Sequence, residues 1–148
     1  ILFLALTLIN CSQNESKSDK PNIIIILADD LGYGDIGVFG NKNIRTPNID
    51  KMSFEGQKWT NFYAGASVCT PSRAALLTGR LPLRSGLTSN TEGVLFPNSL
   101  YGIPQSEITI AEQLKKSNYK TKLVGKWHLG NKEEYFPMNH GLTHGLNR

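Results

Sequence analysis

The chain has 148 residues, about one domain, and carries 16 Lys and Arg against 12 Asp and Glu, a net charge of +4. With 39% hydrophobic and 19% charged residues, it is neither a disordered polyampholyte nor a membrane-embedded bundle. Its basic residues form no run longer than Lys115-Lys116, so we expect no nucleic-acid partner, whereas an anionic small substrate suits the charge. Two cysteines are too few for a disulfide framework.

Residues 1–9 are apolar, too short to span a bilayer, and followed by a polar stretch, which predicts the core of an export signal. We therefore expect a periplasmic protein or membrane-anchored lipoprotein in a bacterium, and otherwise a secreted or lysosomal protein. Leu8-Ile9-Asn10-Cys11 resembles a lipoprotein cleavage box in which Cys11 is lipidated, although Asn10 departs from the usual small residue. An ordinary signal peptide with an incidental cysteine is the alternative. Residues 1–20 are thus interpreted as a truncated signal and tether, and residues 21–148 as the domain.

A buried strand is predicted at residues 22–28, a nearly continuous run of β-branched and other apolar residues. Such a run is typical of a strand covered on both faces in a mostly parallel sheet. Asp29 and Asp30 follow it directly, before a glycine-rich turn that ends at Asp35. Ligands of open α/β sheets bind beyond the carboxyl ends of the strands, so the two acids are well placed for a site. We expect Asp35 to hydrogen-bond within the turn.

Two helices are predicted from Thr-Pro starts, in which threonine is the N-cap and proline takes the first helical position. One is expected over residues 46–55, and the other over residues 70–77 with Gly79 closing it. Residues 81–107 show no period and contain three prolines and three glycines, which is typical of a functional or disordered loop.

The second half of the domain continues the alternation of strands and helices. Residues 109–112 form a capping box that begins a helix, with Glu112 and Lys116 as an i,i+4 ion pair. Residues 58–64 and 120–125 have strand character. The alternation predicts an α/β fold with a mostly parallel or mixed sheet sandwiched by helices.

Cys69 directly precedes the Thr70 cap, so its side chain is expected near the N-terminus of the helix that carries Arg73. Free backbone N–H groups and the helix dipole favour a thiolate or a bound anion there, and Arg73 adds a permanent positive charge. On these residues alone, a buried thiol that packs as a small hydrophobe is the simpler interpretation.

The string around this cysteine, CTPSR at residues 69–73 followed by LTGR at residues 77–80, resembles the signature of the sulfatase family. Three further blocks match in the same order: residues 21–35, 46–50 and 125–130. The resemblance covers residues 21–148 and is closest to the arylsulfatase A-like branch. It implies the alkaline-phosphatase-like fold, incomplete in this chain, and oxidation of Cys69 to formylglycine by a formylglycine-generating enzyme.

The chemistry explains why sulfate ester hydrolysis uses such a residue. One hydroxyl of the aldehyde hydrate attacks sulfur and releases the alcohol, and deprotonation of the other re-forms the aldehyde and expels sulfate. A serine would instead be left as a stable sulfate ester. Covalent catalysis thereby divides one difficult step into two easier ones.

The resemblance also implies a metal site. Asp29, Asp30 and the formylglycine at Cys69 would bind a divalent cation, Ca²⁺ or alternatively Mg²⁺, both of which prefer oxygen ligands. The cation would polarise the sulfate and one hydroxyl of the hydrate. Without the resemblance, an Asp-Asp pair would be interpreted as a solvated turn or helix cap.

Three further residues acquire roles from the resemblance. Arg73 and Lys126 would hold the hydrate and the sulfate oxygens, and so offset the charge that builds in the transition state. His128 would contact the formylglycine hydroxyl and help to take its proton. Trp127, between the last two, is expected in the core.

Three other residues stay outside the expected site. Ser72 is expected at the second position of its helix, and His140 and His144 match no block of the family and are interpreted as loop residues. Two histidines without a third partner are weak evidence for zinc.

Complete sulfatases have further cation ligands, another histidine and another lysine after the point that corresponds to residue 148, so we expect this N-terminal fragment alone to be inactive. The expected substrate is a sulfated carbohydrate or an aryl sulfate. One alternative is a phosphate or phosphonate ester hydrolase of the same superfamily. The other is a lipoprotein that binds sulfated glycans without catalysis and keeps Cys69 unmodified.

Overall fold

The computed structural model describes residues 20–88 and 93–143 and divides the chain into two units, residues 1–30 and 31–148. The expectations for the export signal and Cys11, and that for His144, lie outside the described residues. Within the part that the structure describes, no helix is long and apolar enough to cross a membrane.

The sheet predicted from the sequence is not formed in the part of the chain that the structure describes. None of the three expected segments, residues 22–28, 58–64 and 120–125, is a strand. The five apolar side chains from Ile23 to Leu27 are 46–82% exposed, although the sequence predicted burial on both faces. A strand is stabilised by backbone hydrogen bonds to a neighbour, and no ladder forms among the described residues.

The second unit begins with three short helices: η1 (Tyr33–Asp35), η2 (Gly37–Phe39) and α1 (Pro47–Glu55). The Asp35 carboxylate accepts the Gly32 N–H at 2.8 Å, which confirms its expected place within the turn. Helix α1 has the predicted bounds, with Thr46 as N-cap residue and Gly56 as C-cap residue.

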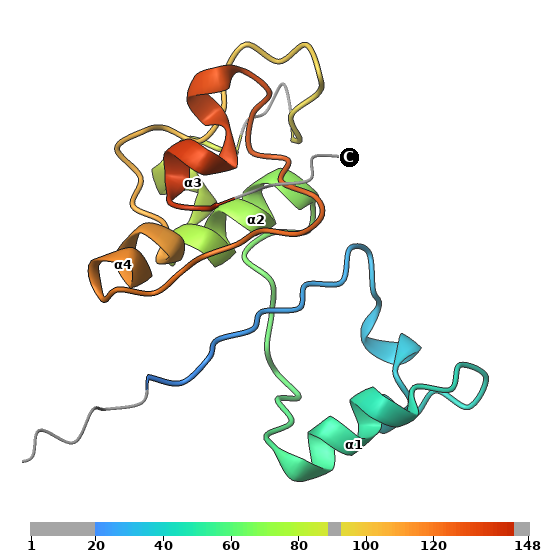
Figure 1. Ribbon diagram of the computed structural model, residues 1–148. Coiled ribbons are helices and arrows are strands. Elements are labelled where there is room, and N and C mark those ends of the chain that lie inside the picture. Colours follow the sequence, from blue (N-terminus) through green and yellow to red (C-terminus); the bar gives the residue numbers. More distant parts are fainter. Residues whose placement is uncertain (1–19, 89–92, 144–148) are drawn as a thin grey trace, which may run out of the picture. The chain divides into compact units, whose positions relative to one another are not determined.

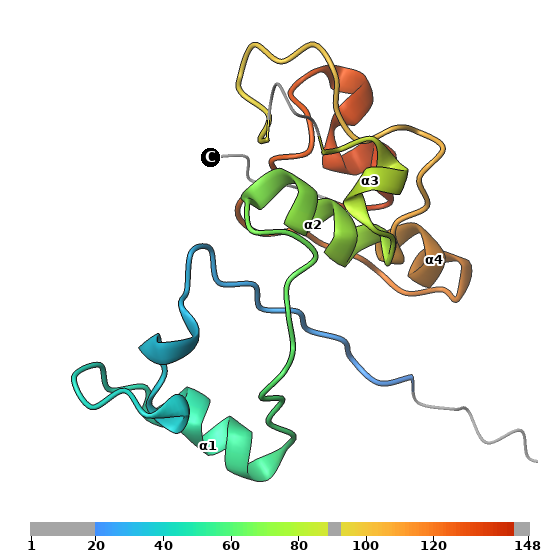
Figure 2. The same ribbon diagram turned by 180° about the vertical axis from the view of Figure 1, so that it is seen from behind.

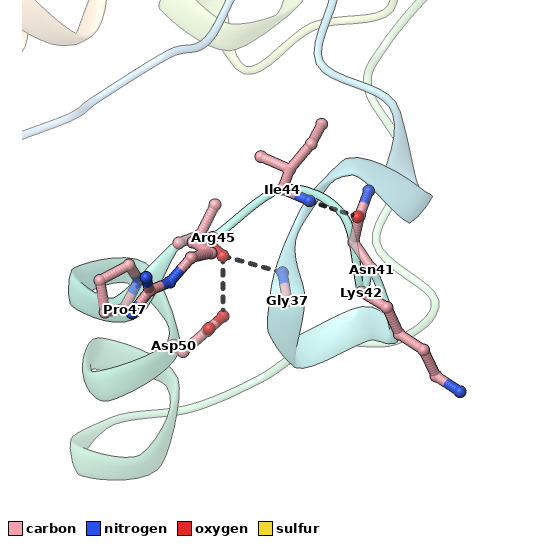
Figure 3. Close-up of a pocket in the computed structure, with 8 residues that line it drawn as sticks. Gly37, Asn41, Lys42, Ile44, Arg45, Pro47 and Asp50 are labelled. Carbon is pink, nitrogen blue, oxygen red and sulfur yellow. Dashed lines mark hydrogen bonds between the residues drawn. The ribbon is translucent and has the colours of Figure 1, made fainter.

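The Thr46 hydroxyl does not cap α1, contrary to the prediction. It accepts the Gly37 N–H at 2.8 Å and donates to the Asp50 carboxylate at 3.0 Å, and so joins η2 to α1 (Figure 3). Asp50 also accepts the Val38 N–H at 2.7 Å. Gly37, Thr46 and Asp50 are among the residues that line an open pocket of about 280 Å³, and none of the predicted site residues lines it.

Residues 69–143 contain the buried core of the described chain. Helices α2 (Cys69–Thr78), α3 (Pro82–Ser85) and α4 (Ile110–Lys116) lie together with η3 (Glu133–Tyr135) and η4 (Pro137–His140), as both ribbon views show (Figures 1 and 2). Eight apolar side chains form the core: Ala74, Leu87, Leu95, Ile103, Ala111, Trp127, Leu129 and Leu142. Because α2 and α4 each contribute one alanine, loop residues supply most of the core.

Helix α2 begins two residues earlier than predicted. Val68 is the N-cap residue and Cys69 the first helical residue, so Thr70 is not the cap, and Ser72 is the fourth residue of the helix instead of the second. The C-terminus follows the prediction: Gly79 adopts φ 64° and donates its N–H to the Ala75 carbonyl at 2.9 Å. This left-handed conformation suits glycine, which has no Cβ to clash.

The described parts of the segment of residues 81–107, which are residues 81–88 and 93–107, are more ordered than the sequence indicates. They contain α3 and bury Leu87, Leu95 and Ile103 to 3% exposure or less. The Ile103 N–H donates to the Leu129 carbonyl at 2.7 Å. Apolar residues at irregular spacing pack this segment into the core. Hydrophobic periodicity cannot detect them, because they follow neither the helical nor the strand period.

The capping box of α4 is confirmed, but the expected ion pair is wrong. Thr109 accepts the Glu112 N–H at 3.2 Å, and the Glu112 carboxylate accepts the Thr109 N–H at 2.7 Å. Lys116 donates to Gln113 at 3.2 Å. The cap uses the carboxylate that the ion pair would have required.

Candidate active site

Cys69 occupies the first position of α2 as a half-buried free cysteine. The first four N–H groups of a helix lack intrahelical acceptors, and the helix dipole adds positive potential there. The predicted placement of this residue at a helix N-terminus is therefore confirmed. A sulfate or another anion beside Cys69 would meet this positive end.

Arg73 lies one turn further along α2 and connects the helix to the segment of residues 125–130. Its Nη1 donates to the Lys126 carbonyl at 2.6 Å, and both side chains are half-buried. The bond joins residues 53 positions apart. Two of the predicted cations are thus brought to neighbouring positions, with the Arg73 guanidinium held by the backbone of Lys126.

Thr70 brings His128 to the same end of α2. Its buried hydroxyl donates to the His128 carbonyl at 3.0 Å and accepts the Leu95 N–H at 3.0 Å. The sequence predicted that this hydroxyl caps its helix, and Leu95 was not among the predicted site residues. No periodicity or motif marks Leu95, since its backbone rather than its side chain makes these contacts.

His128 has an unusual backbone and a defined ring contact. Its φ is 59°, a left-handed conformation that is costly for a residue with a Cβ. Its ring Nε2 lies 2.6 Å from the Leu95 carbonyl, while Nδ1 is buried and has no hydrogen-bond partner within the described chain. Strained backbone of this kind clusters at functional sites, which supports the predicted role.

Trp127 lies in the core as predicted, 4% exposed, and its Nε1 donates to the Tyr135 carbonyl at 2.8 Å. His140, expected in a loop, is instead the fully buried last residue of η4, with its ring centroid 5.9 Å from that of Trp127. Burial lowers the pKa of His140 from its ordinary value of 6.5, and the Glu112 carboxylate partly opposes this. The Thr109 hydroxyl holds the His140 carbonyl at 2.8 Å, so this histidine is part of the packing.

The two predicted cation ligands, Asp29 and Asp30, are exposed residues at the end of the first unit. Asp30 has φ 58°, again left-handed and without a glycine. Two adjacent carboxylates offer the oxygen donors that Ca²⁺ and Mg²⁺ prefer, so the donor chemistry fits such an ion. They supply part of the six to eight ligands that Ca²⁺ takes, and no group of three or more His, Cys, Asp or Glu residues gathers in the described ranges.

The sulfatase family model matches residues 21–147 of the chain. The chain is 52% identical over 129 residues to arylsulfatase A of Bos taurus, covering 86% of this chain and 25% of that protein. It is 50% identical over 136 residues to steryl-sulfatase of Homo sapiens, covering 88% and 23%. The crystal structure of Ps i-CgsB resembles it with a TM-score of 0.77 and 42% identity, over 83% of this chain and 27% of that one.

The chain therefore belongs to the sulfatase family. Its solved neighbours are sulfatases with the alkaline-phosphatase-like fold, and the family generally uses formylglycine and a divalent metal. The chain spans about a quarter of the length of the curated relatives that it matches.

Proposed function

We propose that the full-length protein that carries this chain hydrolyses sulfate esters to an alcohol and inorganic sulfate. The observation that supports this best is the arrangement at the start of α2. Arg73 is bonded to the Lys126 backbone and Thr70 to the His128 backbone, so two hydrogen bonds join the first turns of α2, which begins at Cys69, to the segment that carries Lys126 and His128. Membership of the sulfatase family supplies the reaction class.

Each residue has a proposed task. Cys69, once oxidised to formylglycine by the modifying enzyme, supplies the hydrate hydroxyl that attacks sulfur. The Arg73 guanidinium and the Lys126 ammonium bind the anionic oxygens, with Arg73 oriented by the Lys126 carbonyl. His128 takes a proton from the hydrate so that the aldehyde re-forms and sulfate leaves.

We further propose that Asp29 and Asp30, together with the formylglycine at Cys69, hold a divalent cation, Ca²⁺ rather than Mg²⁺. Such a cation polarises the sulfate. Family membership and the carboxylate chemistry support this assignment. Residues 21–148 are proposed as the N-terminal part of the catalytic domain, whose predicted sheet would require strands from the rest of the protein.

For the substrate we propose a sulfated carbohydrate. One solved neighbour is Ps i-CgsB in complex with k-i-k-neocarrahexaose, and another comes from work on the metabolism of multiple glycosaminoglycans by Bacteroides thetaiotaomicron. We propose that the 81–107 segment contributes to binding of the alcohol part, because its residue Leu95 is bonded to Thr70 and to the His128 ring. Export of the protein, and lipidation of Cys11, remain proposals from the sequence.

The test compares turnover of an aryl sulfate, an aryl phosphate and sulfated oligosaccharides by the full-length protein, expressed together with the modifying enzyme. Sulfate release that greatly exceeds phosphate release, and that Cys69→Ala abolishes, is the expected result. Preferential turnover of the phosphate would indicate a phosphoester hydrolase instead. Binding of the sulfated oligosaccharide with no turnover by protein whose Cys69 is modified would contradict the proposal.

A further inference from the structure

One buried hydroxyl joins three segments that are distant in sequence. Thr70, 2% exposed, donates to the His128 carbonyl and accepts the Leu95 N–H, each at 3.0 Å. Loss of this hydroxyl would leave a donor and an acceptor without their partner in a place that water reaches poorly. The first turn of α2, the 81–107 segment and the backbone of His128 are therefore fixed at one point.

The backbone of Leu95 also holds the His128 ring. Its carbonyl lies 2.6 Å from Nε2, and because a carbonyl only accepts hydrogen bonds, Nε2 must carry a proton. A second proton on Nδ1 would place an unpaired N–H in a buried position, since Nδ1 has no partner within residues 20–88 and 93–143. In the neutral ring, the proton is therefore on Nε2 and the lone pair on Nδ1.

We infer that Thr70 and the Leu95 backbone are positioning elements that present Nδ1 of His128 as the atom that accepts the proton in the reaction. This inference rests on the proposed function, in which His128 deprotonates the hydrate. The left-handed φ of 59° at His128 fits the assignment. The bond from Thr70 to the carbonyl of that same residue helps to hold a conformation that a free chain would rarely adopt.

The first test substitutes Thr70 in the full-length protein. Each measured kcat is divided by the fraction of enzyme molecules in which Cys69 has been converted to formylglycine. Thr70→Val keeps the shape and removes both bonds, and it is expected to lower kcat about 10- to 100-fold with little change in KM, as loss of a positioning partner does. Thr70→Ser keeps the hydroxyl and should restore kcat to within about threefold of the wild type. The matched control is Thr78→Val, in the last turn of the same helix. Its hydroxyl donates to the Ala74 carbonyl at 2.7 Å and accepts the Arg80 N–H at 3.3 Å, and its loss should leave kcat unchanged.

Three outcomes of this series overturn the inference. The first two are a wild-type kcat in Thr70→Val and a Thr70→Ser variant as impaired as Thr70→Val. Equal losses of kcat in Thr70→Val and Thr78→Val would also overturn it, because a general destabilisation of α2 would then explain both losses.

The second test reads the tautomer without using activity, by nitrogen NMR of the full-length wild-type protein with labelled histidine. The His128 signals are identified by their loss in His128→Gln. A proton on Nε2 and none on Nδ1 is expected, and the opposite tautomer overturns the inference even in an active enzyme. The expected tautomer in a protein that never releases sulfate supports the positioning geometry and contradicts the proposed function alone.

Discussion

The Arg73 guanidinium donates a hydrogen bond of 2.6 Å to the backbone carbonyl of Lys126, 53 residues further along the chain. Because this acceptor is a backbone atom, the bond orients Arg73 without using the Lys126 side chain. It also ties the helix that begins at Cys69 to the segment that carries His128. Arg73 and Lys126 come from distant parts of the sequence, and a single backbone carbonyl joins them.

Arg73→Lys is expected to lower kcat strongly although it preserves the positive charge. A lysine ammonium cannot hold the Lys126 carbonyl and present a planar fork to sulfate oxygens at the same time. The expected loss is about 100- to 1,000-fold, the scale for removal of one donor that stabilises transition-state charge. Steady-state kinetics with formylglycine-corrected enzyme measures it. The exposed Arg84 provides the control: Arg84→Lys should retain the wild-type kcat, and an equal loss in both variants would contradict the role of Arg73.

Cys69→Ser should stop after a single turnover. The serine hydroxyl can attack sulfur and release the alcohol, but it has no second hydroxyl to expel the sulfate from carbon. The protein is therefore expected to gain the mass of one sulfonate group on the peptide that contains position 69. Cys69→Ala, which lacks a nucleophile, should gain nothing, and steady multiple turnover by Cys69→Ser would refute the hydrate mechanism.

Arg80 and Glu107 form a second link that holds the C-terminus of α2. Their side chains meet at 2.6 Å, and Glu107 is 4% exposed whereas the Arg80 side chain is 46% exposed. Arg80→Ala leaves a buried carboxylate unpaired, and should lower the free energy of unfolding by about 1–3 kcal/mol, toward the lower end because solvent screens the guanidinium.

Chemical denaturation of the full-length protein measures this difference. The matched control is Lys51→Ala, which breaks an exposed pair with Glu55 at 3.6 Å and should cost at most about 1 kcal/mol. Equal effects of the two substitutions would show that burial of Glu107 contributes nothing.

His140 should make the protein less stable as the pH falls. Burial lowers its pKa in the folded state, so above 6.5 the imidazole is neutral whether the chain is folded or unfolded. Below that pH the unfolded chain takes up a proton more readily than the folded one, and stability is lost until the folded-state pKa is passed. His140→Phe should therefore flatten the fall of the thermal midpoint between about pH 7 and pH 5. A variant curve parallel to that of the wild type would contradict this assignment.

The sequence predicted those helix starts and stops that depend on residues within one turn of each other. The capping box at Thr109 forms as expected because both of its side-chain bonds lie within one turn. Helix α1 has the expected bounds, with Pro47 at its first position and Gly56 as C-cap residue, although the Thr46 hydroxyl does not cap it. Helix α2 begins two residues earlier than expected, and the Thr70 hydroxyl bonds to His128 and Leu95, which no local rule anticipates. Expected strands such as residues 22–28 need partners from elsewhere, and a run of apolar residues cannot supply its own ladder.

The candidate site likewise contains residues that the sequence predicted and one that it could not predict. Motif blocks identified Cys69, Arg73, Lys126 and His128, and hydrogen bonds to backbone carbonyls connect the segments that carry them. Leu95 could not be predicted, because a leucine whose contribution comes from its N–H and C=O has no signature in the sequence.

Whether Cys69 becomes formylglycine is measured by the mass of the tryptic peptide of residues 59–73, from full-length protein expressed with a modifying enzyme. We expect an aldehyde in place of the Cys69 thiol, trapped by a hydrazide. An intact thiol that can be alkylated, in a host that fully converts a known sulfatase peptide, would contradict this expectation.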